Sequence, residues 1–174
     1  LASADVQTVL SGQARNHSAR RGLAQTYLAQ GDTTNAIAQY SEVIHLRSND
    51  VQAYTARGVV HVARGDLASA RADFDRALEL DSTSAAAYTG LGTILAAEYD
   101  HAGAIELYNL AVNVGPESLG AYLNRGRSYL ATESYARAAS DFARVVALSK
   151  GEVEARLLFA EALLPLNDYG RALS

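Results

Sequence analysis

The chain contains four histidines, the side chains that most often bind metals or transfer protons near neutral pH. They stand at His17, His45, His61 and His101. None has a second histidine four residues away, the spacing of a helical metal-binding pair. No serine stands in a Gly-x-Ser-x-Gly turn, and Gly90 and Gly92 fall within a predicted helix rather than a phosphate-binding loop. We therefore expect no catalytic residues, no cofactor, no metal ligands and no enzymatic activity.

Two arginine–aspartate pairs share one spacing and indicate a different chemistry. Arg57 and Asp73 are 16 residues apart, and so are Arg125 and Asp141. Thirty-four residues before each arginine the chain has a leucine, and there the aspartate is absent as well. Because the two residue types change together, we expect an ion pair between two neighbouring helices. Such a pair is costly to break from one side, so we assign it a structural role rather than a binding role.

The helices that carry these residues follow a fixed period of 34 residues. Alanine recurs at this step at Ala36, Ala70, Ala104, Ala138 and Ala172. Aromatic residues recur at Tyr40, Phe74, Tyr108 and Phe142. Small residues recur at Ala24, Gly58, Gly92, Gly126 and Ala160. A period of this length without insertions is typical of stacked helical repeats.

These columns resemble the tetratricopeptide repeat family. The second repeat supplies the family pattern as Tyr54, Gly58, Gly65-Asp66, Ala70, Phe74 and Ala77, and the third as Tyr88, Leu91-Gly92, Ala104, Tyr108, Ala111 and Pro116. The resemblance implies an all-α fold, a right-handed α-solenoid of about five 34-residue helix-turn-helix repeats. We expect one array over 1–174, with repeats at 17–50, 51–84, 85–118 and 119–152, a partial repeat at 153–174, and the second helix of a preceding partial repeat at 1–16.

Each repeat is expected to be two antiparallel helices joined by a tight turn. The turns are marked by Gly31-Asp32, Gly65-Asp66, Tyr99-Asp100, Glu133-Ser134 and Asn167-Asp168. Glycine accepts the left-handed backbone that ends a helix, and aspartate can cap the next helix. His61 stands in a column that other repeats fill with tyrosine or leucine, so we expect it in or near the core.

The resemblance also places a partner in a concave groove lined by the first helix of each repeat. The groove positions lie three or four residues apart and so share one helix face. We predict the partner-binding groove residues as Arg21, Gln25, Gln52, Thr55, Val59, Thr89, Thr93, Leu123, Asn124, Arg127, Leu158 and Glu161. A groove of small, neutral side chains suits an amphipathic helix or an extended peptide. Alternatively, the small residues only allow the superhelix to curve tightly.

One more specific reading of the groove fails. Family members that receive chaperone C-terminal tails use a clamp of Lys, Asn, Asn, Lys and Arg from three successive first helices. Asn124 resembles the middle element of that clamp. The preceding helix has Thr89 and Thr93, and the following helix has Glu154 and Leu158, where the clamp needs Lys, Asn, Lys and Arg. We therefore do not expect chaperone tails as partners.

Composition narrows the remaining classes of function. A formal net charge of -4 argues against a nucleic-acid partner, and no apolar run reaches the roughly 18 residues of a membrane-inserted helix. The absence of cysteine excludes disulfides and thiolate metal sites but does not identify the compartment. We predict a non-catalytic protein-interaction scaffold or adaptor. The alternative is a structural subunit or assembly factor that binds through its ends or convex face, or self-associates through open solenoid ends.

Overall fold

The structure is a computed structural model that describes residues 17–149 and 153–166. The helix predicted at 1–16 and the second helix of the last partial repeat lie outside the described residues. Within the described residues every regular element is helical, and none of these helices is long and apolar enough to cross a membrane. The chain divides into two compact units, residues 1–82 and 83–174, which are described separately below.

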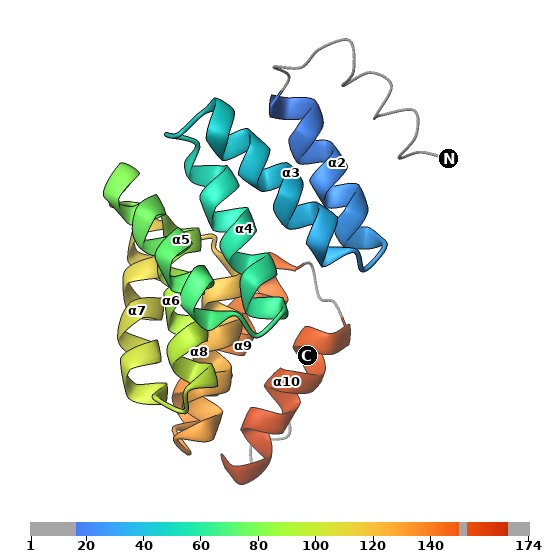
Figure 1. The fold of residues 1–174 in the computed structure, drawn as a ribbon. Coiled ribbons are helices and arrows are strands. Elements are labelled where there is room, and N and C mark those ends of the chain that lie inside the picture. Colours follow the sequence, from blue (N-terminus) through green and yellow to red (C-terminus); the bar gives the residue numbers. More distant parts are fainter. Residues whose placement is uncertain (1–16, 150–152, 167–174) are drawn as a thin grey trace. The chain divides into compact units, whose positions relative to one another are not determined.

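Unit 1 contains two helical hairpins (Figure 1). They consist of α2 (His17–Ala29), α3 (Thr33–Leu46), α4 (Val51–Ala63) and α5 (Leu67–Leu80). Each helix packs against the next one along the chain, so α3 lies between α2 and α4. The helix bounds match the first and second helices of the repeats predicted at 17–50 and 51–84.

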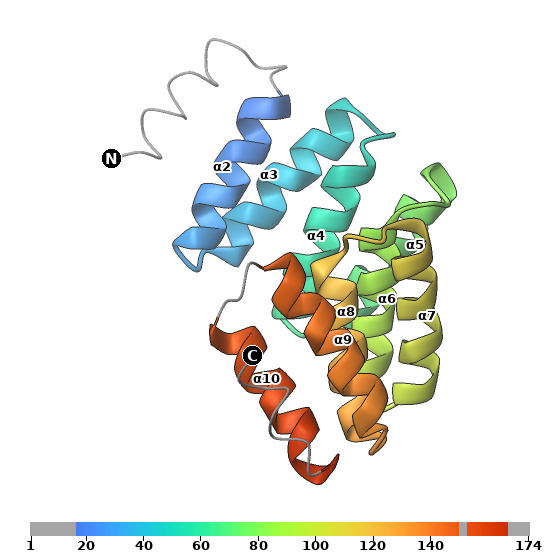
Figure 2. The same ribbon diagram turned by 180° about the vertical axis from the view of Figure 1, so that it is seen from behind.

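Unit 2 continues the same pattern with two hairpins and one further helix. Its elements are α6 (Ala85–Ala97), α7 (His101–Val114), α8 (Leu119–Ala131), α9 (Tyr135–Leu148), α10 (Val153–Leu163) and the short 3-10 helix η1 (Leu164–Leu166). Neighbours along the chain pack together, and α6 also contacts α8. Figure 2 shows α10 beside α9, at the end of this series of helices. Whether the two units form the single array predicted from the period remains a prediction.

The turns within repeats are built as the sequence predicts. Gly31 and Gly65 have φ angles of 76° and 77°, in the left-handed region where glycine carries no steric penalty. Asp32, Asp66 and Asp100 then cap the next helix by accepting a backbone N–H three residues on. At Glu133-Ser134 the turn is also present, but Ser134 makes no side-chain capping bond. The turn predicted at 167–168 lies outside the described residues.

The two helices of a repeat meet where a glycine faces an aromatic ring. A Cβ atom placed on Gly58 would lie 2.7 Å from a ring carbon of Phe74, and one on Gly126 would lie 2.7 Å from Phe142. Both rings are fully buried. The small-residue column therefore lets the first helix approach the aromatic ring of the second helix closely, which is the packing expected from the sequence.

Candidate partner-binding faces

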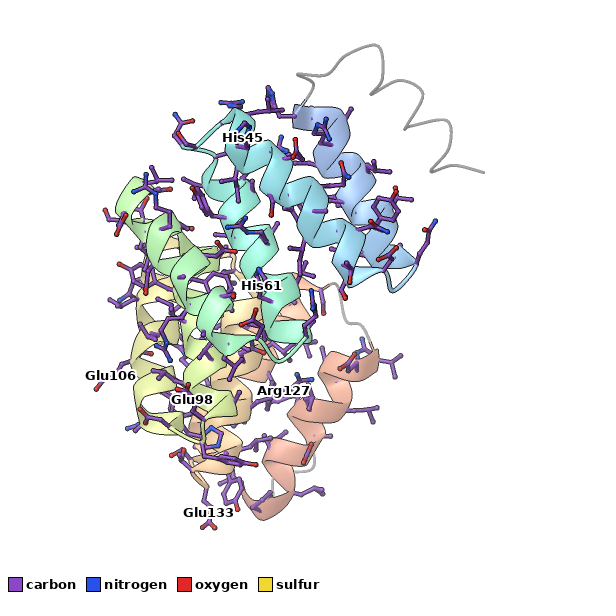
Figure 3. The ribbon with its side chains drawn as sticks, viewed as in Figure 1. His45, His61, Glu98, Glu106, Arg127 and Glu133 are labelled. Atoms are coloured by element: carbon purple, nitrogen blue, oxygen red, sulfur yellow. The ribbon has the colours of Figure 1, made fainter. Side chains whose placement is uncertain are left out.

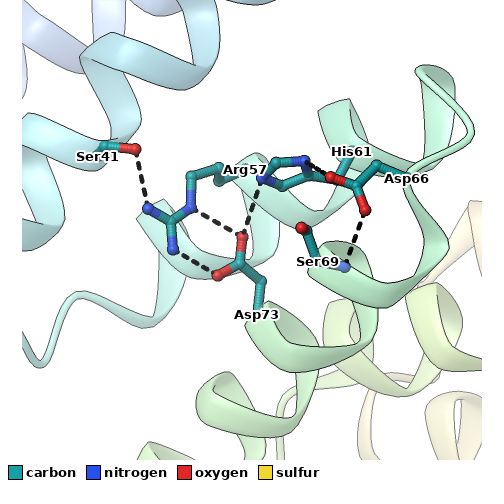
Figure 4. Close-up of polar contacts among 6 residues, drawn as sticks. All are labelled: Ser41, Arg57, His61, Asp66, Ser69 and Asp73. Atoms are coloured by element: carbon teal, nitrogen blue, oxygen red, sulfur yellow. Dashed lines mark hydrogen bonds and ion pairs between the residues drawn. The ribbon is translucent and has the colours of Figure 1, made fainter.

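Both predicted ion pairs are present, and their geometry is structural. Arg57 donates from Nε and Nη2 to the two carboxylate oxygens of Asp73, at 2.8 and 2.6 Å (Figure 4). Its third nitrogen, Nη1, donates to Ser41 Oγ at 2.9 Å. The hydrogen bond to Asp73 raises the pKa of Arg57 above its ordinary value. One guanidinium thus joins α4 to α5 of its own repeat and to α3 of the preceding repeat.

Arg125 repeats this arrangement in unit 2. It donates to both carboxylate oxygens of Asp141 at 2.8 and 2.7 Å, and to Asn109 Oδ1 at 2.7 Å. Its guanidinium also lies over the Tyr122 ring, 5.4 Å from the centroid. The bond to the preceding repeat is a finding that the sequence reasoning missed. Because these polar groups satisfy one another, they fix helix packing rather than bind a ligand.

His61 occupies the partly buried position expected of it. Its side chain is 14% exposed, with Nδ1 3.3 Å from Asp66 Oδ2 and Nε2 4.0 Å from Asp73 Oδ2 (Figure 4). Nδ1 is buried and has no hydrogen-bond partner of good geometry. Among the described residues, no group of three or more His, Cys, Asp and Glu side chains is arranged to hold a metal ion.

Unit 1 has a surface cavity on the side of its first helices. Its volume is about 330 Å³, and it is lined by Ser18, Arg21, Gly22, Gln25, Tyr40, Gln52 and Ala56. Every lining residue except Tyr40 stands at a groove position of α2 or α4. Gly22 leaves this side of α2 bare, because a Cβ there would meet no atom within 4 Å. The cavity is therefore open space on the face that the sequence assigns to a partner.

The charge in this cavity is already balanced. Arg21 donates from Nη1 to Gln52 Oε1 and lies 3.8 Å from Asp50 Oδ1. Asp50 is only 8% exposed and also caps α4 by accepting from the Ala53 N–H. Burial raises the pKa of Tyr40, and the nearby Arg21 partly offsets that rise. The site thus offers amide, hydroxyl and guanidinium groups with little net charge, which suits a neutral hydrogen-bonding segment.

Unit 2 has a polar centre on the equivalent face. The Thr93 hydroxyl donates to the Thr89 carbonyl at 2.8 Å and accepts from Asn124 Nδ2 at 3.1 Å. Tyr108 Oη lies 3.4 Å from the same hydroxyl. These bonds hold α6, α7 and α8 together and use one end of the Asn124 amide. The Asn124 carbonyl oxygen makes no bond within the described part of the chain.

Toward α10 the face of unit 2 becomes more apolar. Leu123, Leu130 and Leu158 are partly buried against one cluster that contains Phe142 and Leu163. Arg127 of α8 donates to Glu154 of α10 at 3.4 Å. Both side chains are more than half exposed, so this pair contributes little to stability. Figure 3 shows Arg127 projecting toward α10.

The structure places all twelve predicted groove residues on first helices. Unit 1 carries Arg21, Gln25, Gln52, Thr55 and Val59, and unit 2 carries Thr89, Thr93, Leu123, Asn124, Arg127, Leu158 and Glu161. Within the units the structure joins Arg21 to Gln52 and Thr93 to Asn124, and it packs Leu123 and Leu158 against one cluster. Val59 and Glu161 are exposed.

Two residues of the unit 1 cavity were missed. Asp50 precedes the first residue of α4, where a capping aspartate is a recognisable signal, but nothing in the sequence indicates that it also faces Arg21. Tyr40 belongs to a second helix, so a groove defined by first helices omits it. Its ring reaches the cavity between α2 and α4 because the small residue Ala24 packs against it.

Family models match most of the chain. A model described as a TPR repeat matches residues 24–63, and one described as a tetratricopeptide repeat matches residues 55–118 and 123–174. No curated protein matches the sequence.

Solved structures resemble the chain in fold. The crystal structure of MamA is 23% identical with a TM-score of 0.67 and covers 86% of this chain and 87% of its own. TTC0263, a thermophilic TPR protein of Thermus thermophilus, is 17% identical with a TM-score of 0.81 and covers 94% and 89%. YrrB, described as a TPR protein with an unusual peptide-binding site, is 20% identical with a TM-score of 0.61 and covers 97% and 87%. These likenesses confirm the predicted fold class, an all-α solenoid of helix-turn-helix repeats.

Proposed function

Because the chain belongs to the tetratricopeptide repeat family, we propose that it is a non-catalytic scaffold that binds a peptide or helix of a partner protein along the groove side of its first helices. Members of this family are in general protein-interaction modules that bind other proteins. The likeness to YrrB, a protein described as having a peptide-binding site, adds support for a peptide as the bound segment.

The unit 1 cavity carries the proposal. Six of its seven lining residues stand at groove positions, and its volume of about 330 Å³ is enough for one or two side chains of a partner. Gln25 and Ser18 are exposed at its edge. Amide and hydroxyl groups of this kind bind a peptide backbone by donating and accepting hydrogen bonds in the same place.

The cavity can be blocked without touching any existing contact. Gly22→Leu would fill it, and because a Cβ at Gly22 meets nothing within 4 Å, the helix should tolerate the change. Ala38→Leu on the exposed side of α3 is a matched control that adds the same side chain away from the cavity. Both variants should give the far-UV circular dichroism spectrum of the unmodified chain.

The test is capture of proteins from a lysate of the source organism, read by mass spectrometry. We expect one or more proteins to be retained by the unmodified chain and by Ala38→Leu, and lost with Gly22→Leu. Retention of the same proteins by all three chains would contradict binding at the cavity and would favour the structural-subunit alternative, in which ends or convex faces bind.

A further inference from the structure

The last described helix has an apolar face that nothing in the described part of the chain covers. Val153 and Leu157 of α10 and Leu164 of η1 are 75%, 65% and 53% exposed. They are spaced by four and seven residues, which places them along one side of the helix. We refer to these three residues as the apolar ridge. Its flanks carry opposite charges, with Glu161 on one side and Arg156 on the other.

The same positions one repeat earlier are covered by a helix. Leu123 and Leu130 of α8 precede Leu157 and Leu164 by 34 residues, and they pack against a cluster to which α10 contributes Ala162 and Leu163. The ridge thus has the shape that accepts a helix in this fold. The residue that links these two helices electrostatically is Arg127, which donates to Glu154 of the covering helix at 3.4 Å.

The charge at the corresponding place on α10 is reversed. Thirty-four residues after Arg127 stands Glu161, which forms no ion pair with the described residues. A helix that covered the ridge as α10 covers α8 would place its counterpart of Glu154 beside Glu161. A basic residue there would pair with Glu161, whereas an acidic one would repel it.

A second copy of this chain does not supply such a helix. The counterparts of Glu154 in its other first helices are Ser18, Gln52, Ala86 and Gly120, none of which is basic. We therefore propose that the apolar ridge is a docking site for an amphipathic helix of another protein, which places leucine-sized side chains on the ridge and a Lys or Arg against Glu161. This site is distinct from the unit 1 cavity and does not depend on it.

The test uses two fluorescein-labelled synthetic peptides and the full chain. Each peptide carries the sequence of α10, Val153–Leu163, extended by alanine-rich helical caps, because an isolated helix shorter than about 12 residues is marginal in water. One peptide keeps glutamate at the place of Glu154, and the other carries Glu154→Lys. In fluorescence anisotropy at low salt, we expect the lysine peptide to bind the chain about two- to five-fold more tightly, the effect of one exposed ion pair.

Two protein variants complete the design. Glu161→Lys in the chain should reverse the preference, so that the glutamate peptide binds more tightly. Leu157→Asp/Leu164→Asp should weaken both peptides at least about ten-fold, because it removes the apolar contact. Val59→Asp in unit 1 is the matched control, since Val59 is also an exposed apolar residue, at 57%, and this change should leave peptide binding unaltered.

Three results would overturn the proposal. The first is equal binding of both peptides with no reversal by Glu161→Lys. The second is an unmodified chain that is dimeric by light scattering while Leu157→Asp/Leu164→Asp is monomeric, which would make a second copy the occupant. The third is a lower melting temperature for that double variant without peptide, which would show that the chain already covers its own ridge. None of these results affects the Gly22→Leu test of the cavity.

Discussion

At the scale of single residues, the guanidinium of Arg57 shows how a polar group can stabilise this fold without taking part in binding. It is held by Asp73, which is 4% exposed, and by Ser41. Arg57→Leu would leave the aspartate buried and unpaired, so we expect a loss of about 3 kcal/mol in the free energy of unfolding. Urea denaturation monitored by circular dichroism measures this change.

The double variant Arg57→Leu/Asp73→Gln is the control for that experiment. It recreates the combination of Leu23 and Gln39 that the first repeat uses. Because no charge is then buried, most of the lost stability should return. If Arg57→Leu alone unfolds at the same urea concentration as the unmodified chain, the ion pair has no stabilising role.

A capping aspartate gives a prediction about pH. Asp66 accepts hydrogen bonds from Ser69 that lower its pKa below the ordinary value of 3.8. A lowered pKa in the folded state means that the contribution to stability is present above the unfolded pKa and is lost as pH falls through the folded pKa. We therefore expect the stability difference between the unmodified chain and Asp66→Asn to fall between about pH 5 and pH 2.

Urea denaturation of both chains at several pH values measures that difference. Asp32, which caps α3 and also has a lowered pKa, provides a parallel variant, Asp32→Asn. A stability difference that is constant from pH 7 to the acid limit would show that the cap does not depend on the charge of the aspartate.

Residue-scale prediction from sequence succeeded where two residues change together. The 16-residue spacing of Arg57 with Asp73 identified a pair because leucine and glutamine replace both in the first repeat. The contacts with Ser41 and Asn109 could not be identified in this way. Serine and asparagine are common at half-exposed helix positions, so their type alone does not show that an arginine reaches them.

At the scale of helices, the contact between a glycine and an aromatic ring sets how closely the helices of a repeat approach. A Cβ on Gly126 would lie 2.7 Å from Phe142, so Gly126→Val must displace a buried ring. We expect a loss of about 1–3 kcal/mol, typical of overpacking. Valine is the informative choice, because Ala24 shows that the first repeat accommodates a single methyl group beside its own ring, Tyr40.

Gly120→Ala is the control for Gly126→Val. The nearest atom to a Cβ at Gly120 is 4.0 Å away, on Thr89, so this change adds helix propensity without a clash. Thermal denaturation should place Gly120→Ala at or above the unmodified chain and Gly126→Val clearly below it. Equal melting temperatures for the two variants would contradict the packing argument.

Helix boundaries were predictable because turn signals coincide with the period. Gly31-Asp32 and Gly65-Asp66 combine a left-handed glycine with a capping aspartate, and the helices begin and end there. Tyr99 and Glu133 adopt the same left-handed backbone, with φ of 64° and 56°, although neither is glycine. The 34-residue period located these two turns, since their own residue types would not have done so.

At the scale of the molecule, the period predicts the fold class but not the chemistry of the faces. The sequence placed twelve residues on one side of the first helices by assuming one repeat geometry throughout. It could not show that Arg21 is already bound by Gln52 and faces a buried Asp50, because that depends on side-chain conformations across a helix interface. The remaining open groups are the ones that give each unit its own binding chemistry.

The division into two units leads to a prediction about local stability. One core cluster contains Ala24, Tyr40 and Val60 of unit 1, and another contains Phe142 and Leu163 of unit 2. Each repeat in a solenoid is stabilised mainly by its neighbours, so a weakened repeat opens its own surroundings first. Gly58→Val should therefore increase amide hydrogen exchange in α2–α5, and Gly126→Val in α6–α10, as read by mass spectrometry of peptic peptides. If either variant instead raises exchange equally along the whole chain, the repeats unfold as one cooperative array, which is the single array that the unbroken 34-residue period predicts.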